Sequence, residues 1–341
     1  MRKIGILLIT ALLFAACKPK FAVHPTFYFW RTVYTNQKAE TKYLNDFKSK
    51  SLYVRIMDVD INPDTQEPVP VSPVSFEDSL PKQTTIVPVV YLVNNIFNNL
   101  SEGDSKLLAT RISKFVNSKV NQAGKKTFSE LQIDCDWTKT TRDKYFIFLN
   151  QLKLTPLLKR KQISVTLRLH QVKNLASSGI PPVTKVMLMC YNMGNLRKYG
   201  EQNSILDMKE METYLSDKLE TYPLKIDVAL PLFNWAVVFR KEKYAGISKR
   251  ISKAQINDKK LFKRRGKSTF FDLMIDYPQA GLRTGDVIRW EEVTPDDLLT
   301  ASRFLSRHLK PEERNVVFYH LDNDLLNTFK HDELQKVIDN F

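Results

Sequence analysis

Two pairs of aspartates in this sequence have a spacing that suits acid–base chemistry. The pairs are Asp58 with Asp60 and Asp134 with Asp136. In each pair a single residue separates the two aspartates, near the end of an apolar, strand-like run. Alternate residues of a strand face the same side, so each pair is expected to present two carboxyl groups together. Like charges this close raise each other's pKa, which lets one group donate a proton while another stays ionised. Because Asp60 opens into a turn at 61–64, loop capping is the alternative role for the first pair.

Other polar and aromatic side chains occur where the remaining strand-like runs end. Flat tryptophan faces in a polar mouth are surfaces on which sugar rings pack, and Trp235 and Trp30 are the candidates for this contact. Alternatively, these tryptophans belong to the core and the two histidines are ordinary satisfied polar residues. The side chains that gather in this way are Trp30, Arg31, Trp137, Arg168, His170, Tyr191, Asn192, Asn234, Trp235, His320 and Asp322.

These side chains can meet only if the strand-like runs belong to one sheet. Runs rich in β-branched and aromatic residues lie at 26–31, 52–60, 85–92, 128–137, 162–170, 185–193, 226–235 and 315–322. Helical patterns lie at 39–49, 104–121, 141–159, 206–221, 295–309 and 326–340. Apolar strands that alternate with helices predict a parallel sheet covered on both faces, and eight units predict a closed (β/α)8 TIM barrel. An open doubly wound sheet is the alternative. In a barrel, the carboxyl ends of the strands form the active site.

The first sixteen residues have the features of an export signal. Arg2 and Lys3 precede the apolar run 4–14, which is too short to span a bilayer, and Ala15 and Ala16 stand directly before Cys17. Small residues before a cysteine resemble a bacterial lipobox, so we expect residues 1–16 to be removed and Cys17 to carry lipid. An ordinary secretory signal is the alternative. The expected location is extracytoplasmic, in the cell envelope, with the lipid in a bacterial membrane, the outer membrane being favoured.

Cys135 and Cys190 fall on the fourth and sixth strands of the series. Two strand spacings amount to roughly 9–10 Å, which exceeds the Cα separation of about 7 Å that a disulfide allows. We therefore expect two free thiols on the face away from the site. The sequence has no histidine, cysteine and carboxylate group at metal-ligand spacing and no glycine-rich nucleotide loop, so we predict neither a metal nor a cofactor.

The charge of the chain is concentrated in one segment. The 341 residues include 52 Lys and Arg against 37 Asp and Glu, a net charge of +15, and removal of the signal lowers it to +13. Residues 240–267 alone hold twelve Lys and Arg and two acidic residues. This segment lies in an expected insertion at about 236–293, between strand 7 and its helix. A solvated or mobile surface is the ordinary reading, and a lid or arm that contacts an anionic envelope polymer or phospholipid head groups is the functional one. The export signal and the lack of a reader motif argue against nucleic acid.

Two motifs resemble those of the chitinase-like family 18 glycoside hydrolases. Residues 131–138, LQIDCDWT, resemble D-G-x-D-x-D-W-E on strand 4, and residues 189–192, MCYN, resemble M-x-Y-D/N on strand 6. The whole chain also resembles an uncharacterised group of bacterial lipoproteins that are expected to be glycosidase-like barrels. The resemblance implies that Asp136 orients a substrate N-acetyl group, with Asp134 beside it and Tyr191 and Asn192 in support. The family's general acid is replaced by Thr138, whose hydroxyl is no useful proton donor at neutral pH.

The sequence therefore predicts a membrane-anchored, glycosidase-like barrel that acts on a polysaccharide or glycoconjugate, with hydrolysis favoured over binding. A conventional two-carboxylate mechanism would then take its acid from Asp136, Asp58 or Asp322. The alternatives are a glycan-binding barrel without activity and an envelope scaffold. The predicted catalytic residues are Asp134, Asp136, Tyr191 and Asp322. The predicted substrate-binding residues are Trp30, Arg31, Asp58, Asp60, Trp137, Arg168, His170, Asn192, Asn234, Trp235 and His320.

Overall fold

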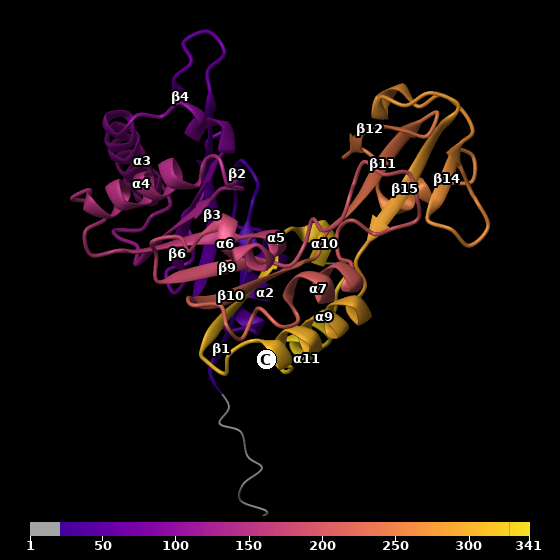
Figure 1. The fold of residues 1–341 in the computed structure, drawn as a ribbon. Coiled ribbons are helices and arrows are strands. Elements are labelled where there is room, and N and C mark those ends of the chain that lie inside the picture. The colour runs from indigo at the N-terminus through magenta and orange to yellow at the C-terminus, as the bar shows by residue number, and fades with distance from the viewer. Residues whose placement is uncertain (1–20, 327) are drawn as a thin grey trace, which may run out of the picture.

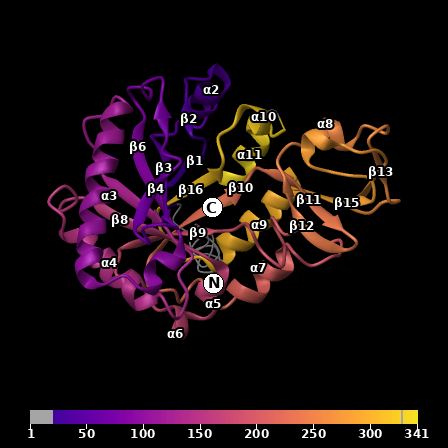
Figure 2. The same cartoon turned by 90° about the horizontal axis from the view of Figure 1, so that it is seen from above.

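The structure, a computed structural model, describes residues 21–326 and 328–341, and its centre is a closed barrel of eight parallel strands (Figures 1 and 2). Neighbours in space are neighbours in sequence, and the pairing of the first strand with both the second and the last closes the ring. The predicted signal at 1–16 and Cys17 lie outside the described residues. The barrel strands are β1 (Val23–Phe29), β3 (Ser51–Ile61), β6 (Thr85–Leu92), β7 (Glu130–Asp134), β8 (Gln162–Leu167), β9 (Lys185–Met189), β10 (Lys225–Pro231) and β16 (Arg314–Tyr319).

This architecture confirms the predicted (β/α)8 barrel and rules out the open sheet. Strands such as β9 are buried along their whole length because side chains face the barrel interior on one side and the helices on the other. A ring of buried residues that includes Tyr28, Tyr53, Met187 and Tyr191 fills the interior, so the barrel is packed rather than hollow.

Helices cover the outside of the ring unevenly. The connection from β3 to β6 has no helix and contains the short strands β4 (Pro68–Val71) and β5 (Ser75–Phe76), of which β4 pairs antiparallel with β3 and β5 pairs with β2 (Val33–Tyr34). The connection after β8 has only two short helices. The helices around the barrel are α2 (Lys38–Asp46), η1 (Asn94–Asn98), α3 (Glu102–Gln122), α4 (Arg142–Leu154), α5 (Leu169–Lys173), α6 (Leu175–Ser178), α7 (Met208–Leu215), α9 (Pro295–His308), α10 (Asn323–Leu326) and α11 (His331–Ile338).

Six of the eight predicted strands extend further at their carboxyl ends than the observed ones, the exceptions being β3 and β6. β7 ends at Asp134, so Asp136 and Trp137 lie in the following loop, and β9 ends before Tyr191. The run predicted as one strand at 226–235 is two strands, because β10 ends at Pro231 and a different sheet begins at Asn234. Several candidate residues therefore lie on loops beyond the strands, where their backbone is not fixed by a ladder.

The insertion between β10 and α9 is a folded antiparallel sheet, and the lysines of residues 240–267 are exposed on it, as expected of a solvated surface. Its strand order is β12-β11-β15-β14-β13, so β12 and β13 are the edges. Two apolar clusters pack within this sheet. One includes Ile288 and Trp290, and the other includes Val237 and Phe239. Figure 1 shows this sheet beside the upper part of the barrel. Its elements are β11 (Asn234–Arg240), β12 (Lys243–Ser248), α8 (Lys253–Ile256), β13 (Phe262–Arg264), β14 (Phe270–Leu273), η2 (Pro278–Ala280) and β15 (Asp286–Glu292).

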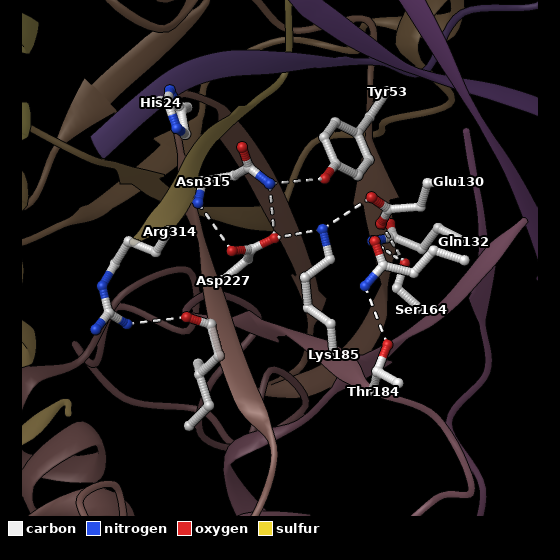
Figure 3. Close-up of polar contacts among 12 residues, drawn as sticks. His24, Tyr53, Glu130, Gln132, Ser164, Thr184, Lys185, Asp227, Arg314 and Asn315 are labelled. Atoms are coloured by element: carbon white, nitrogen blue, oxygen red, sulfur yellow. Dashed lines mark hydrogen bonds and ion pairs between the residues drawn. The ribbon is translucent and has the colours of Figure 1, made fainter. Parts of the chain in front are cut away.

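A buried ionic network occupies the barrel interior near the amino ends of the strands (Figure 3). The Lys185 ammonium lies 2.8 Å from a Glu130 oxygen and 2.9 Å from an Asp227 oxygen, and all three side chains are buried. Asp227 also accepts hydrogen bonds from the backbone and side chain of Asn315, and Glu130 accepts one from Ser164. Because its charges are paired and its oxygens are bonded, this network closes the floor of the barrel at a tolerable electrostatic cost.

The two described cysteines agree with the prediction of free thiols. Cys135 and Cys190 are buried, unbonded to each other, and belong to the apolar layer between the strands and the helices rather than to the barrel interior. Within residues 21–326 and 328–341, no helix is both long and apolar enough to cross a membrane.

Candidate functional site

A cleft of about 870 Å³ opens at the carboxyl ends of β7, β8 and β9. Six of the predicted site residues line it, namely Asp136, Arg168, His170, Tyr191, Asn192 and, at the start of the insertion, Trp235. The remaining lining residues are Thr138, Leu169, Met189, Met193, Gly194, Asn195, Leu196, Ser204, Glu210 and Tyr214. The cleft therefore combines carboxylate, guanidinium, hydroxyl and aromatic groups from separate loops, as expected for a barrel mouth.

Arg168 and Asp136 form a two-point ion pair on one side of the cleft. Nε of Arg168 donates to Oδ1 of Asp136 at 2.5 Å, and Nη2 donates to Oδ2 at 3.2 Å. The Arg168 backbone N–H donates to Gln171, whose amide in turn donates to the Trp137 carbonyl, so the loop after β7 and the start of α5 are held together. The forked guanidinium fixes the plane of the Asp136 carboxylate, which remains 43% exposed.

Asp134 lies beneath this pair as a buried carboxyl group. Thr166 donates a hydrogen bond of 2.7 Å to Oδ1 of Asp134. Burial raises the pKa of Asp134 to about 6; the positive charge of Arg168 opposes this rise and the negative charge of Asp136 adds to it. A group with this pKa gains or loses a proton close to neutral pH, as the aspartate pairing in the sequence predicts.

Two residues that line the cleft each have a buried donor without a partner among the described residues. One is the hydroxyl of Tyr191, whose ring packs against Tyr319 and Phe233. The other is Nη1 of Arg168, which remains free after the ion pair with Asp136 is made. Burying an unpaired donor is costly, so two of them in residues of one cleft are suited to a ligand oxygen.

The insertion positions Trp235 through a buried carboxylate. The indole N–H donates to Glu291 at 2.9 Å, and Glu291 also accepts from Arg289 and from the backbone and side chain of Ser204. Arg289, fully buried, donates to the carbonyls of Leu196, Lys198 and Gly200 in the loop after β9. The insertion is thus fastened to the loop that lines the cleft. Arg289 and Glu291 do not follow a strand of the expected series, so sequence reasoning missed them.

Trp137 is corrected from the predicted sugar contact to a core residue. Its side chain is 0% exposed, stacks on Tyr145 and donates from Nε1 to the Ser178 carbonyl. The residue after the Asp136 carboxylate faces the helices instead of the mouth because successive residues alternate in direction.

Four predicted site residues are held in other contacts and do not line the cleft. Arg55 binds Asp58 through two hydrogen bonds, and Asp60 accepts from the next backbone N–H, which favours the capping role for that pair. Arg31 pairs with the buried Glu40 at 2.6 Å and lies 3.7 Å from Asp322, which also caps α10. Asp322 and Asp58 are therefore poorly placed as acids for this cleft.

The other predicted residues lie around the mouth. Trp30 packs edge-on against Tyr28 and lies against Tyr319, so its ring extends the aromatic wall of the barrel interior. Burial lowers the pKa of His320, which follows β16. Asn234 pairs with Glu292 at the first rung of the insertion sheet. These three residues do not line the cleft that holds Asp136.

Three lining residues bear directly on the chemistry. Thr138, at the position of the family's acid, lines the cleft, and its hydroxyl lies 2.9 Å from that of Thr140 and 3.3 Å from that of Thr141. Glu210 and Tyr214 of α7 also line it and were missed, because their spacing is that of any amphipathic helix. Among the described residues, no cluster of His, Cys, Asp and Glu could hold a metal ion.

The fold of this chain is similar to those of several solved (β/α)8 barrels. A chitinase from Chromobacterium violaceum ATCC 12472 is 14% identical, with a TM-score of 0.54 over 93% of this chain and 99% of that one. The Bacillus cereus spore cortex-lytic enzyme SleL is 13% identical, with a TM-score of 0.53 over 95% and 76%. The chain has the fold of a chitinase-like (β/α)8 barrel.

At this level of identity the likeness concerns the fold alone. A mutant of catalytic domain 2 of the Ostrinia furnacalis Group II chitinase, in complex with penta-N-acetylchitooctaose, is 8% identical, with a TM-score of 0.50 over 92% of this chain and 95% of that one. No protein-family model matches the sequence. No curated protein matches it either. The function of this barrel must therefore be argued from its cleft.

Proposed function

We propose that this barrel is a lipid-anchored, extracytoplasmic glycan-binding protein whose cleft accepts a sugar that carries an N-acetyl group. The observation that carries the proposal is the pair of buried donors, Tyr191 Oη and Arg168 Nη1, which have no partner in the part of the chain that the structure describes. An amide carbonyl accepts from two donors of this kind without bringing a charge into the site. Trp235 provides an aromatic face at the edge of the same cleft.

The geometry favours binding over the hydrolysis that the sequence alone favours. The Thr138 hydroxyl is too weak an acid to protonate a leaving group at neutral pH, and it lies within hydrogen-bond distance of the Thr140 and Thr141 hydroxyls. Asp136 is held by Arg168 at two points, so it is oriented and its charge is offset. A site with a fixed carboxylate and free donors but no acid at the family position can hold a glycan without cutting it.

The anchor and location are proposed from the sequence. Small residues before Cys17 support lipid attachment after removal of residues 1–16, and the favoured site is a bacterial outer membrane. A mass shift of two or three acyl chains on the amino-terminal peptide of the envelope protein, lost in Cys17→Ala, is the expected result.

A secondary contact with an anionic envelope polymer is proposed for the insertion. Lys241, Lys243, Lys259, Lys260 and Lys263 are exposed, and none pairs with an acidic residue within the described ranges. Three other cations of this segment are offset by acids, in the pairs Arg240–Asp286, Lys253–Glu292 and Arg265–Asp272. The free lysines predict binding that weakens with salt and is lost when residues 240–267 are neutralised.

The glycan proposal is tested by calorimetry of the chain from residue 18 onward with N-acetylated oligosaccharides and their deacetylated counterparts. The proposal expects binding of the acetylated set, with affinity reduced about tenfold or more for the deacetylated set, and no release of reducing ends. Equal affinity for both sets would show that the cleft does not recognise the acetyl group. If the protein binds none of the oligosaccharides, the glycan proposal is wrong.

Hydrolysis is a second candidate, and Glu210 is the observation that favours it. Glu210 and Asp136 both line the cleft, although they belong to different elements of the fold. Glycosidases of the common type use two carboxyl groups that flank the sugar in this way. Release of reducing ends that is abolished by both Glu210→Gln and Asp136→Asn is the result expected of an enzyme. Binding that persists in Glu210→Gln, with no release by the unchanged protein, excludes this candidate.

A further inference from the structure

Four loops at the amino ends of the strands form a basic surface on one side of the barrel. These loops, 47–50, 81–84, 123–129 and 155–161, lie beneath β3, β6, β7 and β8, at the end opposite the cleft. They contain eight Lys and Arg and no Asp or Glu. We call them the basal loops, and their cations are Lys48, Lys50, Lys82, Lys125, Lys126, Lys159, Arg160 and Lys161.

The basal loops touch one another, so their charges belong to one continuous surface. The Thr85 backbone donates to the Lys50 carbonyl at 2.9 Å, and the Lys125 ammonium donates to the Pro81 carbonyl at 2.7 Å. The Lys161 ammonium donates to the Thr127 hydroxyl at 2.6 Å. None of the eight cations forms an ion pair within residues 21–326 and 328–341. The surface therefore has positive charge that is not neutralised by its own fold.

Exposed apolar side chains lie at the same end of the barrel. Leu154 at the end of α4 is 73% exposed, and Leu157 in the last basal loop is 42% exposed. The Lys153 ammonium donates to the Pro182 carbonyl at 2.8 Å, which ties the end of α4 to the loop before β9. Leucines beside lysines are the composition of surfaces that rest in the head-group region of a bilayer.

Several aspartates lie at the opposite end of the barrel, while the basic residues of the insertion lie outside the barrel sheet. Asp58, Asp60, Asp134 and Asp136 all lie at the carboxyl ends of β3 and β7, and Asp64 lies just beyond β3. On the other side of the amino end, Lys218 and Lys310 are outweighed by acids at 217, 220, 312 and 313. At the amino ends of the barrel strands, the excess of positive charge thus lies in the basal loops, which gives this end of the barrel a face suited to an anionic plane.

We propose that the basal loops, with Leu154 and Leu157, rest on the anionic head groups of a membrane. Phe21, the first described residue, is 39% exposed and precedes β1 at this same end (Figure 1). It lies four residues after Cys17, a separation that an extended chain spans in about 14 Å. The surface argument is independent of the glycan proposal, and lipid on Cys17 would hold this face at the membrane.

The test is co-sedimentation with vesicles of the chain from residue 18 onward, which contains every described residue and has no lipid of its own. We expect binding to vesicles that contain phosphatidylglycerol, weaker binding at high salt, and little binding to pure phosphatidylcholine. Replacing Lys159 and Arg160 together by Gln is expected to weaken binding by about 30-fold, since each surface cation contributes about fivefold. Replacing Leu154 and Leu157 together by Ser should weaken it several-fold.

A matched pair in the insertion separates this surface from the other basic region. Lys259→Gln with Lys260→Gln removes the same charge from exposed positions and should leave vesicle binding within twofold. Circular dichroism melts confirm that each variant is folded. Three results would overturn the membrane proposal. The first is a loss of vesicle binding in the Lys259→Gln, Lys260→Gln variant but not in the Lys159→Gln, Arg160→Gln variant. The others are vesicle binding by the leucine variant equal to that of the unchanged protein, and an affinity of the unchanged protein for a soluble polyanion equal to its affinity for the vesicles. Glycan affinity, measured on the same variants, stays unchanged if only the membrane contact is altered.

Discussion

Arg168 binds both carboxylate oxygens of Asp136, with Nε 2.5 Å from one oxygen and Nη2 3.2 Å from the other. The pair joins the loop after β7 to the residue that precedes α5, so it sets the shape of the cleft as well as its charge. A lysine cannot reproduce the two parallel bonds of this fork. The pair also explains why one Arg168 nitrogen is left over for a ligand.

Removal of the Tyr191 hydroxyl is predicted to weaken glycan binding without harming the fold. The hydroxyl is buried and has no partner in the part of the chain that the structure describes, so Tyr191→Phe loses only a bond to the ligand, worth about 1–2 kcal/mol or roughly tenfold in affinity. Calorimetric titration and a urea melt measure the two effects. Tyr145→Phe is the control, because its hydroxyl is equally buried and unpartnered among the described residues but packs against Trp137 and Phe97, away from the cleft. An equal loss of affinity in both variants would falsify the role of Tyr191.

The two tryptophans near the cleft are predicted to differ in what their loss costs. Trp235→Ala removes the aromatic face at the edge of the cleft and should lower glycan affinity by tenfold or more in a protein that still folds. Trp137→Ala opens a cavity in the core and should cost about 3–5 kcal/mol of unfolding free energy. Denaturation curves and binding measured side by side distinguish them. A stable Trp137→Ala protein with impaired binding would return Trp137 to the site.

Stability should depend on the protonation of Asp134 between pH 4 and pH 6. Burial raises the pKa of this group to about 6 in the folded state, against 3.8 for the free group, so the folded protein binds more protons in this range. Its contribution to stability is therefore greatest below about pH 4 and is lost as the pH rises through 6.

Asp134→Asn keeps an oxygen that can accept from Thr166 and removes the titration. The variant should match the unchanged protein at pH 4 and be more stable by about 3 kcal/mol at pH 7.5, as urea denaturation at the two pH values would show. A variant that loses stability at pH 7.5 would mean that the ionised carboxylate is favourable where it lies.

The buried ammonium of Lys185 is predicted to be indispensable for folding. Lys185→Met leaves Glu130 and Asp227 as buried carboxylates without their cation, which should cost about 3–5 kcal/mol (Figure 3). Lys218→Met breaks the exposed pair with Asp217 and should cost less than about 1 kcal/mol. Guanidinium titrations compare the two. Equal small losses would show that the network at the floor of the barrel relaxes when a charge is removed.

The sequence allowed the barrel to be predicted because its signal is repeated. Eight apolar runs with turns between them leave few ways to satisfy a parallel sheet, and the Asp134–Asp136 spacing marked the mouth correctly. The direction of single side chains beyond the strand ends was harder to predict. Trp137 and Asp136 are adjacent in the chain, yet one is sealed beneath α4 and the other faces the cleft.

The sequence marked residues 240–267 by their charge and did not predict the sheet to which they belong. Apolar residues on both faces of that sheet, such as Phe239 in one cluster and Ile288 in the other, hold the insertion together. Glu210 was missed because its carboxylate belongs to a helix, and only the path of the chain between β9 and β10 brings it to the cleft.

The placement of the lysines in the insertion sheet has a consequence for how the protein behaves at high concentration. Its two edges, β12 and β13, have unpaired backbone groups on one side, as any open sheet does. Lys243 stands at the start of one edge, and Lys263 and Arg264 stand on the other. Charged side chains along an exposed edge oppose the addition of a strand from another molecule, since two such edges repel each other. Lys243, Lys263 and Arg264 are thus expected to keep the open sheet from pairing with a second molecule, independently of any binding to an anionic polymer.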